Sequence, residues 1–195
     1  NDLSSPKDVN MILLKNEILL KKGNDKENND INDSLKVLLE LDNIRANYVA
    51  NFWKGKFAMD SGKSEVAIDY LLKCVKLYNL ANIDSRDPNI DKAKVLELLA
   101  TCYEHEGEWD SAKAIYDTQG WTGKLKAGHL LVVAKRYKEA LLYLKECTKP
   151  DNKNYPEAWY DLFLAQKALG QRKDAIATLK AYIKKRPNEH HKYAE

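Results

Sequence analysis

Four segments of equal length decide the fold of this chain: GKFAMDSGKSEVA (55–67), ATCYEHEGEWDSA (100–112), GHLLVVAKRYKEA (128–140) and FLAQKALGQRKDA (163–175). Each begins with a small or slot-filling residue, has a turn residue seven positions later and ends with alanine twelve positions later. Two antiparallel helices that cross closely need a constant spacing of this kind. The first and third positions then lie at the helix contact, and the middle position turns the chain. The pattern predicts an array of helical hairpins, which is more often a binding surface than an enzyme.

The distance between the segments varies, although their internal spacing does not. From Ala67 to Ala112 the chain runs 45 residues, and from Ala112 to Ala140 only 28. The long interval predicts an exposed connection over 81–91, where Asp87-Pro88 breaks the helix. The short interval predicts a short helix that ends near Gln119-Gly120, with the next helix starting around Trp121.

The absence of an alternating strand pattern predicts an all-α protein. We expect one helical repeat domain over residues 1–195, with hairpins at about 7–42, 43–78, 92–119, 121–149 and 156–187. The Asn-rich stretch 23–33 is predicted to be a loop in the first hairpin.

The last hairpin resembles the tetratricopeptide repeat (TPR), whose pattern is W-x2-L-G-x2-Y, then A-x3-F, then P. Five of its residues stand at the family's positions: Trp159, Leu162, Ala175, Leu179 and Pro187. Phe163 and Gln166 depart from the small-residue and tyrosine positions. The other hairpins keep part of the pattern, and Lys135 stands where a turn glycine is usual. The resemblance covers residues 45–189, and 7–44 less closely, and it implies a right-handed superhelical array, a TPR-like α-solenoid.

Composition excludes several function classes. The net charge is only +3, so no strong attraction to nucleic acid or an anionic membrane is expected. No apolar run approaches the roughly 20 residues of a membrane helix. The chain starts without Met, so we expect a piece of a longer or processed protein. Its three cysteines form no C-x-x-C motif and are expected to be buried thiols, which favour a reducing, cytoplasmic location.

The sequence contains no recognisable catalytic, cofactor or metal motif. Cys102 and His105 share a helix, but a nucleophile also needs an orienting group and an oxyanion site. The adjacent His190 and His191 point different ways on a helix. The carboxylates of residues 84–91 lack the turn glycine of a calcium loop. We therefore expect no catalytic residue, no metal and no cofactor.

The TPR resemblance implies that the first helices of successive hairpins line a concave groove that holds a protein or peptide partner. The expected lining residues are Phe52, Lys56, Met59, Glu97, Thr101, Glu104, Leu125, His129, Tyr160, Leu164 and Lys167. Phe52, Tyr160 and Leu164 are the expected anchors, and Glu97 and Glu104 are expected to choose a basic stretch of the ligand. The asparagines of the TPR clamps that bind chaperone C-termini are missing, so that function is not expected.

The last hairpin ends in an apolar stripe with no clear polar cap after it, made of Ile176, Leu179 and Ile183. This end is expected to self-associate or to contact a partner. The leading hypothesis is a protein–protein interaction scaffold without catalytic activity. The alternative is a helical regulatory or targeting fragment of a larger enzyme or multi-domain protein, and the full reading frame would decide between them.

Overall fold

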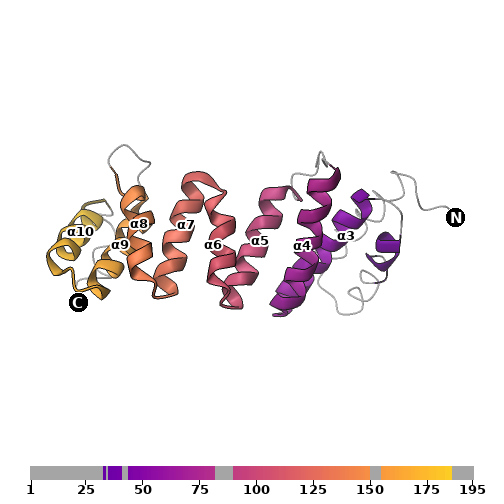
Figure 1. The fold of residues 1–195 in the computed structure, drawn as a ribbon, viewed down its shortest axis with the longest axis horizontal. Coiled ribbons are helices and arrows are strands. Elements are labelled where there is room, and N and C mark those ends of the chain that lie inside the picture. The colour runs from indigo at the N-terminus through magenta and orange to yellow at the C-terminus, as the bar shows by residue number, and fades with distance from the viewer. Residues whose placement is uncertain (1–32, 34, 41–43, 82–89, 150–154, 186–195) are drawn as a thin grey trace. The chain divides into compact units, whose positions relative to one another are not determined.

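The computed structural model describes residues 33, 35–40, 44–81, 90–149 and 155–185. Within these residues the regular structure is helical and no strand occurs (Figure 1). The labelled helices are α3 (Ile44–Asp60), α4 (Ser64–Ala81), α5 (Lys92–His105), α6 (Trp109–Asp117), α7 (Gly120–Val133), α8 (Tyr137–Cys147), α9 (Pro156–Ala168) and α10 (Arg172–Lys185). A short helical stretch over 35–40 precedes them. The predicted helix before residue 23, residues 23–32 of the predicted Asn-rich loop and the chain after residue 185 lie outside the described residues, and Asp33, the last residue of that loop, is helical.

The predicted turn positions adopt one backbone conformation. Gly62, Gly107 and Gly170 have φ of 72°, 73° and 72°, and Lys135 has φ of 59°. Glycine reaches this left-handed region without a steric penalty, which explains why three of the four turns use it. After three of these turns, an amide donates to a carbonyl five residues earlier: Lys63 to Ala58, Arg136 to Leu131 and Gln171 to Gln166. The first helices therefore end in a hydrogen-bonded cap typical of a left-handed C-terminus.

The chain divides into two compact units, Asn1–Glu106 and Gly107–Glu195. In the first unit α4 packs against both α3 and α5. The repeat spacing explains the closeness of α3 and α4, because a Cβ on Gly55 would lie 2.9 Å from Cγ of Leu71. A further core cluster joins Leu35 and Leu38 to Ala46 and Ala50.

The connection between α4 and α5 is more buried at its end than the sequence predicts. Ile90 is only 3% exposed, and its carbonyl accepts a hydrogen bond of 2.9 Å from the Tyr48 hydroxyl on α3. The prediction of an exposed connection over 81–91 is therefore wrong at Ile90, because this side chain fills the core of the first unit. Asp91 then caps α5 by accepting from the Lys94 amide at 2.7 Å.

The second unit is a stack of α6 to α10, in which each helix packs against the next. Helix α6 has only nine residues and ends at Asp117, and α7 begins at Gly120. The short interval in the repeat spacing had indicated this arrangement. A Cβ on Gly123 would lie 1.9 Å from the carbonyl oxygen of Tyr116, so glycine permits the sharp return of α7 along α6. The main core cluster lies between α7, α8 and α9 and includes Leu131, Leu144 and Leu162.

Candidate partner-binding face

The expected groove residues come from the first helix of each hairpin. Six lie in the first unit, on α3 and α5, and five lie in the second unit, on α7 and α9. Helix α7 also packs directly against α9.

Phe52 is not an exposed anchor. Its side chain is 2% exposed, and its ring packs edge-to-face on Trp53 with ring centroids 5.4 Å apart. The prediction for Phe52 fails because α3 is buried around most of its circumference rather than along one stripe. Its aromatic ring belongs to the core of the first unit, and its removal would test folding rather than binding.

The other predicted residues of the first unit are half-buried, and most of the charged ones already have a partner. Lys56 pairs with Asp60 at 3.0 Å, and Lys94 pairs with Glu97 at 3.0 Å. The Thr101 hydroxyl donates to the Glu97 carbonyl. Because Lys94 offsets the charge of Glu97, the negative surface expected from Glu97 and Glu104 is weaker than the sequence alone indicates.

The five predicted residues of the second unit lie on α7 and α9, two helices that are in contact, and we call the candidate surface on these helices the α7–α9 face. It consists of Leu125, His129, Tyr160, Leu164, Lys167 and one residue absent from the sequence prediction, Asp161. Leu125 and His129 are one turn apart on α7, as are Tyr160 and Leu164 on α9. The side chains of Leu125, Tyr160 and Leu164 are half-buried, and Lys167 is exposed. The Tyr160 ring packs on Tyr182 of α10, with centroids 5.5 Å apart.

Asp161 joins the two helices of this face. Its Oδ2 atom lies 3.0 Å from Nδ1 of His129, across 32 residues of sequence. The side chain of Asp161 is 7% exposed, whereas that of His129 is 62% exposed. The sequence offered one signal for Asp161. It is a carboxylate that directly follows Tyr160 and lies in the same helical turn as Tyr160 and Leu164, two predicted lining residues. Its burial and its partner depend on the packing of α7 against α9.

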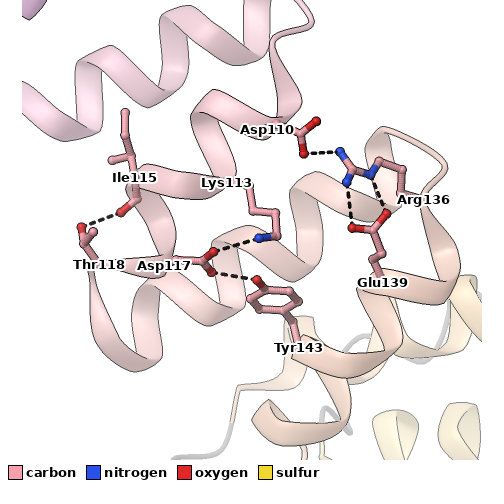
Figure 2. A network of polar contacts seen from close by, with 8 residues as sticks. All are labelled: Asp110, Lys113, Ile115, Asp117, Thr118, Arg136, Glu139 and Tyr143. Atoms are coloured by element: carbon pink, nitrogen blue, oxygen red, sulfur yellow. Dashed lines mark hydrogen bonds and ion pairs between the residues drawn. The ribbon is translucent and has the colours of Figure 1, made fainter.

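The second helices α6 and α8 are joined by a separate polar network (Figure 2). Arg136, just before α8, binds Asp110 of α6 and Glu139 of α8, each at 2.7 Å. Asp117 of α6 accepts from Lys113 at 2.9 Å and from the Tyr143 hydroxyl of α8 at 2.8 Å. The hydrogen bonds from Arg136 hold the pKa of Glu139 below its ordinary value.

The network has a structural role. Its side chains satisfy one another, and they come from α6, α8 and the turn before α8 rather than from α7 and α9. A hollow of about 340 Å³ lies beside it, lined by residues 135–139 and Leu169. Arg136 lines this hollow, but its guanidinium is already engaged by two carboxylates.

The cysteines are buried and unreactive in character. Burial raises the pKa of Cys74 to about 12 and, together with Glu106, that of Cys102 to about 11. The thiolate is the reactive form, so Cys102 beside His105 is no activated nucleophile.

The described residues hold neither a metal cluster nor a membrane-spanning helix. No group of three or more His, Cys, Asp or Glu side chains there is placed to hold a metal ion. None of the helices over those residues combines the length and apolar character needed to cross a membrane.

Comparison with known proteins agrees with this architecture. Residues 48–79 and residues 131–195 each match a model of the tetratricopeptide repeat. No match was found among curated proteins.

The chain is also similar to solved structures. The MamA protein shares 18% identity over 96% of both chains, with a TM-score of 0.68. A Podosopora anserina putative kinesin light chain with nearly identical TPR-like repeats shares 13%, over 95% of this chain and 99% of that one, with a TM-score of 0.65. PilW, a type IV pilus biogenesis factor, shares 16%, over 95% and 81%, with a TM-score of 0.59.

Identities this low relate the chains by fold alone, and that fold is the TPR-like solenoid. Together with the four turns of one conformation and the paired helices, these matches establish the repeat. Residues 48–79 and 131–195 therefore match the tetratricopeptide repeat, and the residues that the structure describes have the all-α fold of a TPR-like solenoid.

Proposed function

We propose that the chain is a non-catalytic scaffold that binds a protein or peptide partner on the first helices of its hairpins, chiefly on the α7–α9 face. The observation that carries the proposal is the combination found on that face. Half-buried Tyr160 and Leu164 lie one turn apart, next to a buried carboxylate and an exposed imidazole. Interfaces of this kind gain most of their affinity from a few aromatic and aliphatic anchors, while charges set specificity.

The residues of the first unit have a supporting role in this proposal. Lys56, Met59, Glu97, Thr101 and Glu104 are half-buried and form a separate candidate surface on the first unit, where part of the charge is offset within the chain. Phe52 is left out because it is buried.

Site-specific photo-crosslinking tests where the partner lies. A benzoylphenylalanine at position 164 is expected to capture a protein from source lysate, and one at position 142 is not. Leu142 is the matched control, because it is 69% exposed on α8, a second helix of the same unit. Capture at position 142 alone would place the interaction on the second helices and contradict the proposal.

Binding measurements with the captured partner then test the anchors. Tyr160→Ala and Leu164→Ala should each weaken binding by more than about 1 kcal/mol, as expected of interface anchors. Leu142→Ala should leave the affinity unchanged. Circular dichroism of each variant separates loss of binding from loss of fold.

A further inference from the structure

We infer that the α7–α9 face selects a partner segment carrying a lysine or arginine, whose cationic group docks against the carboxylate of Asp161. The inference rests on the proposed function, since it assigns a chemistry to the partner of the same face. It starts from the burial of Asp161 and from the few groups that offset its charge.

The carboxylate of Asp161 is only partly satisfied. Its Oδ2 atom lies against Nδ1 of His129, and no other hydrogen bond or ion pair to it is found among the described residues. The side chain keeps 7% of its surface exposed, so a ligand can reach it only at close contact. A buried carboxylate is costly unless it is paired and hydrogen-bonded. A cation from outside the chain would supply the missing charge.

His129 does not supply that charge in its neutral form. A neutral imidazole donates one hydrogen bond, and only the doubly protonated ring forms an ion pair with the carboxylate. The neutral ring becomes more populated as the pH rises. While the ring is neutral, His129 orients the carboxylate and leaves its negative charge available to a ligand.

The surroundings favour a basic side chain beside an apolar one. Glu157 lies one turn before Asp161 on α9 and is exposed. Tyr160 and Leu164 offer aromatic and aliphatic surface next to the carboxylate. The nearest lysine along the helix, Lys167, places its ammonium 5.9 Å from the centroid of the Phe163 ring. An arginine suits the site well, because its planar group can bind a carboxylate and stack on an aromatic ring.

A peptide selection tests this chemistry directly, because it needs no identified partner. Phage-displayed random dodecapeptides would be selected at pH 8 against the whole chain and, in parallel, against Asp161→Asn. The wild type should enrich peptides with Lys or Arg at one fixed position beside an apolar residue. Asp161→Asn should keep the apolar preference and lose the basic one. Asp174→Asn is the matched control, because it removes one exposed carboxylate from α10 of the same unit.

Two substitutions at His129 test the same idea without altering Asp161. His129→Lys places a permanent positive charge beside the carboxylate and should abolish the basic preference. His129→Gln stays neutral and should retain it. Because the His129 side chain is 62% exposed, both variants should fold even if Asp161→Asn does not.

Affinities of one selected peptide complete the test. Asp161→Asn should weaken binding at least about tenfold, as expected when one partner of a close charge pair is removed. Replacing the basic residue of the peptide by leucine should weaken binding to the wild type by a similar factor. The two changes together should cost no more than either one alone, because both remove the same contact.

The outcomes separate this inference from the proposed function. Enriched peptides with no fixed basic position, or an unchanged basic preference in Asp161→Asn or His129→Lys, would overturn the inference and leave the scaffold function standing. Failure of the wild type to enrich any peptide would count against both.

Discussion

Lys135 holds a backbone conformation that the other three turns assign to glycine. At φ of 59° its side chain meets the steric penalty that residues other than glycine have in the left-handed region. The Schellman-type hydrogen bond from Arg136 to Leu131 still forms, so the surrounding helices impose the turn on an unfavourable residue. The turn geometry of the array therefore comes from helix packing, and glycine only lowers its cost.

Lys135→Gly should stabilise the protein by about 0.5–1 kcal/mol, because it removes the left-handed strain at some entropic cost. The reciprocal change, Gly170→Ala, should destabilise the protein by a similar amount, since Gly170 has φ of 72° and no neighbour within 4 Å of an added Cβ. Urea unfolding of both variants measures the two effects. If both substitutions changed the free energy of unfolding in the same direction, the explanation would be contradicted.

At Gly123 the steric contact and helix propensity predict opposite effects of an alanine substitution on stability. Alanine normally stabilises a helix relative to glycine by about 1 kcal/mol. At Gly123, however, an added methyl group would lie 1.9 Å from the Tyr116 carbonyl oxygen. Gly123→Ala should therefore destabilise the protein by on the order of 1–3 kcal/mol through overpacking. Thr122→Ala, an exposed neighbour on α7, is the control in thermal unfolding, and a stabilised Gly123→Ala would show that α7 can move away from α6.

For single residues, the spacing of the repeat predicts which positions form turns and helix contacts better than it predicts how buried a side chain is or what it contacts. The turn residues and the buried alanines follow from the constant register. Phe52 was misjudged because its exposure depends on what surrounds α3, which periodicity along α3 does not report. Asp161 was missed because its contact with His129, 32 residues away, is what marks it as part of the candidate site, and no local sequence pattern shows that contact.

At the scale of helices, the polar contacts between α6 and α8 change the pKa of a carboxyl group on α6. Burial raises the pKa of Asp117, but hydrogen bonds from Lys113 and Tyr143 lower it by more, so its pKa lies below the ordinary value. A carboxyl group with a lowered pKa stabilises the fold above its unfolded-state pKa. That contribution is lost as the pH falls through the folded-state value.

Tyr143→Phe should destabilise the protein by about 0.5–1.5 kcal/mol at pH 7, the usual net value of one hydrogen bond. The difference from the wild type should shrink as the pH falls into the range where Asp117 takes up its proton. Unfolding at a series of pH values between 7 and 3 measures this trend. The control is Tyr143→Phe in an Asp117→Asn background, where the pH trend of the difference should disappear.

Element lengths could be predicted where they follow from counting. The interval of 28 residues indicated a short α6, and the structure gives it nine residues. The α6–α8 network could not be predicted in this way. Its partners, Arg136 with Asp110 and Tyr143 with Asp117, belong to different hairpins, and no local pattern in either helix points to the other.

At the scale of the whole chain, two compact units raise the question of cooperativity. Each unit has its own core, around Leu35 and Leu38 in the first and around Leu131 and Leu144 in the second. Stability in repeat arrays is roughly a sum over repeats and nearest-neighbour interfaces. Local damage should therefore remain local, although the sequence predicted a single domain over residues 1–195.

Ala175→Leu tests this expectation. Ala175 is 4% exposed on α10, so leucine should overpack that contact at a cost of about 1–3 kcal/mol. Hydrogen exchange should show lost protection in α9 and α10, with α3 and α4 unchanged. Ala177→Leu, at an exposed position of the same helix, is the control. A uniform loss of protection in both units would instead favour one cooperative domain.

The joint between α6 and α7 has a consequence for how the gene tolerates changes in length. Only Thr118 and Gln119 separate the two helices, and Gly123 leaves no room between α7 and the end of α6. A codon inserted inside α7 just after Gly123 would turn the Gly123 end of the helix by about 100° relative to the rest of α7, because each helical residue turns by that angle. The residues that now meet α8 and α9 would then face elsewhere. Insertions and deletions that preserve the fold should therefore occur away from this joint, because the joint fixes the orientation of α7 and of the helices that pack on it.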